Sequence, residues 1–205
     1  RWDARVDPVG VSIARLMSGA SNGQTFDGLK HVVVELLRNA AQHSGDKGGA
    51  VVAAQVSEQG GVPWVQVAVG DAGIGVYQHL SYFHRDLTSV QEALEKALHP
   101  HYSGAFAEGQ SGTDENAGLG LFVTSELAKV TGGRLLLASR GDALLVRAQQ
   151  QPQFLDHGGF PGTLVAFECP LWALRDFSTL FAEIIAKAEA RTPKPRLNFR
   201  NCASK

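Results

Sequence analysis

Apolar residues recur at three- and four-residue intervals in the segment that follows Asp27. The stripe consists of Leu29, Val32, Val33, Leu36, Leu37 and Ala40. This spacing places the apolar side chains on one side of an α-helix, because a helix makes one turn every 3.6 residues. Asp27 carries a side chain suited to a helix N-cap. We therefore predict an amphipathic helix from Asp27 to about His43.

Two β-rich runs follow this helix. They cover residues 50–57 and 64–69, and residues 60–63, Gly-Gly-Val-Pro, separate them. Short β-rich runs divided by glycine and proline are typical of neighbouring antiparallel strands. The pattern predicts a β-hairpin.

The second half of the chain returns to a helical pattern and then to strands. The helical pattern begins at Leu119 and ends at Gly132-Gly133, a pair suited to a left-handed C-terminal cap. Three β-rich runs follow, at residues 134–139, 143–148 and 163–169. A tight turn at 140–142 joins the first two. Residues 177–190 resemble a closing helix, and residues 192–205 form a basic tail without an acidic side chain.

The order of these elements predicts an α+β fold. Helix, hairpin, long loop, helix and three strands indicate a two-layer α/β sandwich: a mixed, largely antiparallel sheet with helices on one face. A doubly wound nucleotide-binding fold fits this order poorly. The long connection, at about 77–117, is polar and rich in glycine and histidine, with one predicted helix at 89–98. Connections of this length are usually functional lids or mobile segments.

Composition narrows the choice of partners and of compartment. The 205 residues carry 19 Lys and Arg against 20 Asp and Glu, so the net charge of -1 gives no field that would attract nucleic acid. No apolar stretch approaches the roughly 20 residues that span a bilayer. The two cysteines, Cys169 and Cys202, favour a reducing compartment, and we expect a cytoplasmic protein. The chain begins at Arg1 without Met, so we expect a piece of a longer protein, with flanking domains outside it.

Candidate chemistry begins on the first predicted helix and in the loop after the hairpin. Glu35 and Asn39 are four residues apart and share one side of the helix, either as an ordinary solvated face or as groups presented to a ligand. Asp71 follows a strand and precedes Gly73 and Gly75. Glycine lets a ligand approach the backbone, and a carboxylate accepts hydrogen bonds from an amine such as that of adenine. The alternative is a plain turn after a strand.

A third candidate stands at the start of the second predicted helix. The sequence there runs Asn116-Ala-Gly118-Leu-Gly120-Leu121. Unpaired N–H groups at a helix N-terminus attract phosphate, although a flexible helix start would show the same residues. Neither a P-loop nor a complete dinucleotide-binding glycine motif occurs, so a phosphate site here must be of another type.

The ordered set of these motifs resembles the histidine-kinase-type ATPase superfamily, also called GHKL or Bergerat-type ATPases. The resemblance rests on Glu35-x-x-x-Asn39, Asp71-x-Gly73-x-Gly75, Gly118-x-Gly120-Leu121 and Gly162-Thr163, in that order. The superfamily includes gyrase-type topoisomerases, a large chaperone class, mismatch-repair ATPases and sensor kinases. The run ELLRNAAQH, residues 35–43, is similar to that of the anti-sigma-factor serine kinases.

The resemblance implies a role for each matching residue. Asn39 would coordinate the magnesium ion of Mg-ATP, Asp71 would bind adenine with support from Thr163, and Glu35 would act as general base. The remaining matches would shape the adenine side (Gly73 and Gly75) and the phosphate side (Asn116, Gly118, Gly120 and Leu121).

The expected domain organisation follows from the same resemblance. We expect a helical extension at 1–25, an ATPase domain at 26–175 with its lid at about 77–117, and a C-terminal helix and tail at 176–205. The expected function is ATP hydrolysis or transfer of the γ-phosphate, as an ATPase or protein kinase. The alternative is a non-catalytic module in which ATP or ADP orders the lid so that a partner protein docks. A protein partner or additional domains are expected, and a homodimer is left open.

Overall fold

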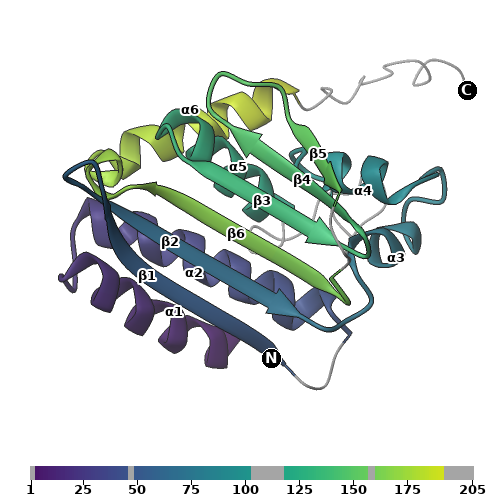
Figure 1. Cartoon of the computed structure of the whole chain (residues 1–205), viewed down its shortest axis with the longest axis horizontal. Helices are drawn as coiled ribbons and strands as arrows, with labels where there is room; N and C mark the ends of the chain where they lie inside the picture. The colour runs from purple at the N-terminus through teal and green to yellow at the C-terminus, as the bar shows by residue number, and fades with distance from the viewer. Residues whose placement is uncertain (1–2, 46–48, 103–117, 157–159, 192–205) are drawn as a thin grey trace, which may run out of the picture.

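A six-stranded antiparallel sheet organises the chain. The computed structural model describes residues 3–45, 49–102, 118–156 and 160–191 (Figure 1). The strand order is β1-β2-β6-β3-β4-β5, and every ladder among the described strands is antiparallel. In that order the strands are Ala50–Gln59, Val62–Asp71, Thr163–Pro170, Arg134–Ser139, Asp142–Arg147 and Gln153–Asp156.

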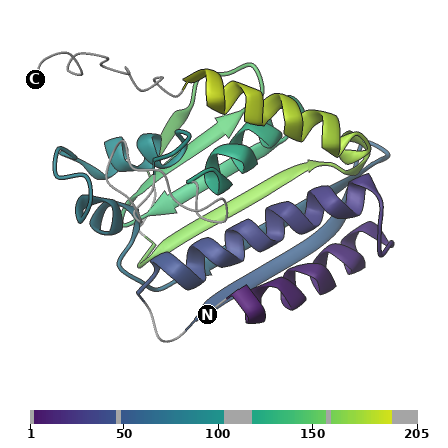
Figure 2. The same cartoon turned by 180° about the vertical axis from the view of Figure 1, so that it is seen from behind.

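Helices cover one face of this sheet, as Figures 1 and 2 show. The helices on that face are α1 (Asp3–Ser18), α2 (Gln24–His43), α5 (Gly120–Val130) and α6 (Phe177–Arg191). The short helices α3 (Val76–Ser81) and α4 (Val90–Ala97) lie toward the end of the sheet where β3 finishes, and the 3-10 helix η2 (Leu171–Leu174) follows β6. The α+β fold predicted from the sequence is confirmed.

The core lies between the helices and the sheet. Every second side chain of β2 is buried, namely Val65, Val67 and Val69, because alternate residues of a strand point to the same face. They meet the predicted apolar stripe of α2, in which Leu29, Val32, Val33 and Leu36 are each at most 1% exposed. The apolar stripe therefore forms the buried face of α2, as its spacing predicts.

Helix α1 packs closely along α2. A methyl group at Gly10 would overlap with Cγ2 of Val34, so glycine is needed for this approach. Ala14, one helical turn further along α1, is fully buried. Two small residues thus fix α1 against α2, outside the sheet-facing side of α2 (Figure 2).

Several elements differ from the sequence prediction. Helix α2 begins at Gln24, not at Asp27, because the N–H of Asp27 already donates to the carbonyl of Gly23 (2.9 Å). Helix α3, η2 and β5 were not predicted. They have six, four and four residues, too few to show a periodicity, and residues 153–155 of β5 are exposed. The hairpin turn is the pair Gly60-Gly61, whose positive φ angles of 57° and 78° suit a two-residue turn.

Among the described helices, none has the length and the apolar character that crossing a membrane requires.

The central strand β3 should carry far more stability than the edge strand β1. Leu137 of β3 is fully buried, whereas Val51 of β1 is 77% exposed. We expect Leu137→Ala to lower the free energy of unfolding by about 2–5 kcal/mol, through lost burial and the cavity left behind. Val51→Ala, the matched control, should change it by less than about 0.5 kcal/mol. Urea unfolding of both variants checks this, and equal losses would contradict the packing described.

Candidate functional site

A cavity of about 270 Å³ opens between α2, the end of β2, the start of β6 and the start of α5. It gathers side chains and backbone from segments far apart in the sequence. Of the residues that the sequence singled out, those lining it are Glu35, Asn39, Asp71, Gly75, Gly118, Gly120, Leu121 and Thr163. Gly73 does not line it, and Asn116 lies outside the described residues.

The α2 wall of the cavity carries Glu35 and Asn39 one helical turn apart. The Nδ2 atom of Asn39 is buried and has no hydrogen-bond partner among the described residues. A buried amide without a partner costs free energy, which binding of a ligand or water would recover. Leu36 and Ala40 of the same helix also line the cavity, so this wall combines polar groups with part of the apolar stripe.

Asp71 and Thr163 form the second polar wall. They are directly opposite one another in the β2–β6 ladder, which brings their side chains together on the helix-covered face. Asp71 is only 7% exposed. Its Oδ1 atom accepts a hydrogen bond from the N–H of Gly73 (2.8 Å), and this bond fixes the carboxylate as the strand ends.

Gly73 serves the site through packing. A Cβ atom there would overlap with the carbonyl oxygen of Ser44, at the end of α2. The N–H of Ile74 donates to that same carbonyl (2.8 Å). A Cβ atom at Gly162 would likewise overlap with the backbone of Asp71. These contacts pack the loop after β2 tightly between the end of α2 and the start of β6. The two elements therefore determine the position of Asp71.

The corner between β3 and β4 holds the same loop from another side. The buried hydroxyl of Ser139 accepts from the N–H of Val76 (3.0 Å) and donates to the carbonyl of Gly162 (2.9 Å). The guanidinium of Arg140 donates to the carbonyls of Gly73 (2.8 Å) and Ile74 (3.3 Å). Sequence reasoning predicted only a tight turn here, because a serine and an arginine beside a turn carry no signal of such contacts.

The N-terminus of α5 forms the third wall. Its N-cap residue, Leu119, makes no side-chain cap, and Gly118 has a φ of 65°, which favours glycine. A Cβ atom at Gly120 would overlap with Oε2 of Glu35. The glycine therefore leaves room for the Glu35 carboxylate beside the positive end of α5.

Sequence reasoning missed the apolar part of the cavity and the contribution of α6. The apolar lining includes Leu36, Val69, Leu80, Val165, Phe181 and Ile185. Phe181 also packs edge-on against the His31 ring, with centroids 5.1 Å apart, and Phe177 lies 5.8 Å from it. Burial, and then the charge of Arg38, lowers the pKa of His31 to about 4. His31 is therefore neutral at pH 7.

The first part of the predicted lid carries two helices where the sequence predicted one. Helix α4 is confirmed, with Ser89 as its N-cap: the Ser89 hydroxyl accepts from the N–H of Glu92 (3.1 Å). The added helix, α3, precedes it. The rest of the predicted lid, residues 103–117, lies outside the described residues.

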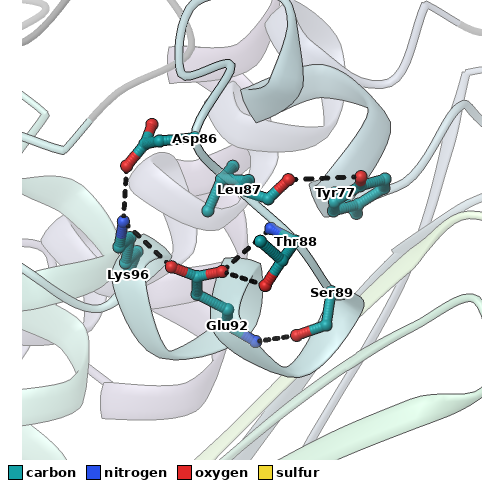
Figure 3. A network of polar contacts seen from close by, with 7 residues as sticks. All are labelled: Tyr77, Asp86, Leu87, Thr88, Ser89, Glu92 and Lys96. Carbon is teal, nitrogen blue, oxygen red and sulfur yellow. Dashed lines mark hydrogen bonds and ion pairs between the residues drawn. The ribbon is translucent and has the colours of Figure 1, made fainter.

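Polar contacts join these lid helices (Figure 3). The Glu92 carboxylate accepts from the backbone and the hydroxyl of Thr88, at 2.9 and 2.8 Å. Lys96 pairs with Asp86 (3.0 Å) and with Glu92 (3.1 Å), and both carboxylates raise the pKa of Lys96. The hydroxyl of Tyr77 donates to the carbonyl of Leu87 (3.4 Å). This part of the lid is therefore held by its own contacts.

The fold and the cavity define a class of protein: a two-layer α+β domain with a cavity between a helix that carries polar residues, an acidic strand end and a helix N-terminus. Comparison with known families then matches residues 24–171 to the histidine kinase-, DNA gyrase B- and HSP90-like ATPase family, and the chain belongs to that family. It is an ATP-binding domain of the ATPase or kinase kind. The comparison with curated proteins gave no match.

The partly buried His31 should make the fold less stable in mild acid. Its pKa is about 4 in the folded protein against a usual 6.5, so between these pH values the unfolded chain binds more protons. The stabilisation is complete above pH 6.5 and is lost as the pH falls, with a loss of about 2 kcal/mol at pH 5.

Urea unfolding at pH 8 and pH 5 measures this loss, and His31→Gln should show a smaller difference between the two pH values. Some dependence should remain, because burial also lowers the pKa of His79. Replacing the exposed His99 by Gln is the control and should leave the difference unchanged. An unchanged difference in His31→Gln would show that another group is responsible.

Proposed function

We propose that this domain binds Mg-ATP in the cavity and hydrolyses it or transfers its γ-phosphate, with Glu35 as general base. The observation that carries the proposal is the convergence of Glu35, Asn39, Asp71, Thr163 and the start of α5 on one cavity. These groups differ in chemistry and match different parts of one nucleotide. The proposed ATPase domain spans residues 26–175, with 1–25 and 176–205 as extensions.

Adenine would lie at the Asp71 end of the cavity. The buried carboxylate can only accept hydrogen bonds, so it favours the exocyclic amine of adenine over a carbonyl at the same place. Thr163, directly opposite in the ladder, has a hydroxyl that can both donate and accept. The apolar residues nearby, Val69 and Val165, suit the faces of a purine ring.

Phosphates and magnesium would lie between α2 and α5. The carboxamide oxygen of Asn39 is a hard ligand that suits Mg²⁺, an ion that usually keeps several waters and binds phosphate oxygens as well. The Asn39 amide is buried at the cavity wall, and the N-terminus of α5 faces it across the site without a side-chain cap. The residues present therefore fit the group. When bound, the ion would neutralise phosphate charge.

The position of Glu35 in the cavity suits it to act as a general base. One of its carboxylate oxygens lies against Gly120, at the proposed phosphate end of the cavity. A carboxylate there can take the proton of an attacking water or of a serine hydroxyl. The similarity of residues 35–43 to the serine kinases favours a serine hydroxyl of a partner protein as the attacking group, which gives phosphate transfer. Attack by water would instead give hydrolysis.

A second function is supported by the cavity's contacts with the lid. Four lining residues come from the described part of the lid, namely His79, Leu80, Ala97 and Tyr102. A bound nucleotide would touch them directly, so it could order the lid for docking of a partner protein without any turnover. Steady release of phosphate from the domain favours catalysis. Protection of the lid from protease by an ATP analogue, with no phosphate release, favours the docking module.

The general-base role predicts that Glu35→Gln separates turnover from binding. Glutamine keeps the size of the side chain but cannot take a proton, and positioned bases contribute about 10²–10⁴-fold. We expect turnover of ATP to fall at least about 100-fold, while ATP affinity stays within about twofold. Phosphate release and calorimetric binding measure the two quantities. Full turnover in Glu35→Gln would rule out the role.

The adenine role predicts a different result for Asp71→Asn. The asparagine amide presents N–H donors where only an acceptor suits the adenine amine. Loss of the negative charge also weakens the hydrogen bond that residue 71 accepts from the N–H of Gly73. We expect ATP affinity to fall by at least about tenfold, the equivalent of one charge-assisted hydrogen bond. Calorimetry checks this, with circular dichroism as the control for folding. Unchanged affinity in a folded variant would place adenine elsewhere.

A further inference from the structure

Arg38 connects the proposed general base to the N-terminal helix. One guanidinium nitrogen pairs with Oε1 of Glu35 (3.2 Å), and another contacts both carboxylate oxygens of Asp7 on α1, at 3.1 and 3.4 Å. All three side chains are partly withdrawn from solvent, with exposed fractions of 25% for Arg38, 22% for Glu35 and 46% for Asp7. One cation thus stands between two carboxylates.

We propose that Arg38 is a positioning residue for Glu35 and that Asp7 keeps Arg38 from neutralising it, so that α1 forms part of the active site. The inference rests on the proposed function, because it concerns the proposed base. It reaches beyond the region matched to the family, which begins at residue 24, after α1 has ended at Ser18.

The orientation of Glu35 supports the positioning role of Arg38. Its Oε1 atom is held by the guanidinium, and its Oε2 atom lies against Gly120. Fixing one oxygen directs the other toward the start of α5, where the attacking group would stand. A glutamate side chain without such a contact samples several rotamers. The ion pair with Arg38 restricts Glu35 to few of them, so less conformational entropy is lost when Glu35 takes the orientation that the reaction needs.

The charge balance gives Asp7 its role. A guanidinium paired with a single carboxylate favours the charged form and makes that carboxylate a weaker base. Sharing the same guanidinium with Asp7 leaves the group of three with a net charge of -1, so Glu35 keeps more of its basic character. Helix α1 is held in place for this contact by the close packing of Gly10 on Val34.

The experiment compares Asp7→Asn, Arg38→Gln, their double variant and Glu35→Gln in the full chain. Turnover is measured at saturating Mg-ATP, affinity by ATP calorimetry, and folding by the urea midpoint. We expect Asp7→Asn to lower turnover about tenfold with affinity within twofold, equivalent to about 1.4 kcal/mol at 25 °C. Arg38→Gln should lower turnover by a similar or larger factor. The double variant should be no worse than Arg38→Gln alone, because Asp7 acts through Arg38.

Two further variants separate positioning from a purely structural role. Asp7→Glu keeps the negative charge, so it should retain most of the turnover that Asp7→Asn loses. Asp27→Asn, an exposed aspartate on α2, is the matched control and should leave turnover unchanged. A positioning role changes turnover without changing affinity or the urea midpoint, whereas loss of structure would lower all three together.

The outcomes distinguish failure of this inference from failure of the proposed function. If Glu35→Gln retains turnover, or the wild-type chain shows none, the proposed function is wrong and the inference falls with it. If Glu35→Gln is inactive while Asp7→Asn and Arg38→Gln turn over normally, only the inference is wrong. Additive losses in the double variant, or a fall in affinity and stability that matches the fall in turnover, would also overturn it.

Discussion

The register between β2 and β6 is the constraint on which the proposed site depends. It sets Asp71 directly opposite Thr163 on the helix-covered face, at the point where β2 ends. Glycines at 73 and 162 allow backbones to approach from two sides, and the Ser139 and Arg140 contacts hold the loop from a third. A one-residue slip in this ladder would turn Asp71 to the opposite face of the sheet, away from the cavity.

The second constraint is the close approach of α5 to α2. This approach brings the positive end of α5 next to the carboxylate of Glu35 on α2, and Gly120 leaves room for that carboxylate. The core stripe of α2 fixes the rotation of that helix, so burial of Val32 and Leu36 against the sheet also sets where Glu35 and Asn39 point. The same helix therefore serves both the core and the proposed site. A substitution in the apolar stripe should change the orientation of Glu35 and Asn39 as well as the stability of the fold.

The sequence was sufficient for the fold class and for part of the cavity lining, including Glu35, Asn39, Asp71 and Thr163. Long periodic segments such as the α2 stripe, and short motifs in a fixed order, carry that information in the residues themselves. Contacts between distant segments do not. The Ser139 and Arg140 clamp, the Phe181 contribution from α6 and the Asp7–Arg38 pair, 31 residues apart, depend on tertiary packing that no local pattern shows. Short elements such as α3 and β5 were missed for lack of length.

The central claim is that Asn39 and Asp71 contact opposite ends of one bound nucleotide. A crystal structure of the chain with Mg²⁺ and a non-hydrolysable ATP analogue tests it most directly. The account predicts the adenine amine within hydrogen-bond distance of the Asp71 carboxylate, and the magnesium ion about 2.1 Å from the Asn39 carboxamide oxygen. A nucleotide bound outside this cavity, or one that reaches Asp71 with its phosphates directed away from Asn39, would contradict the account.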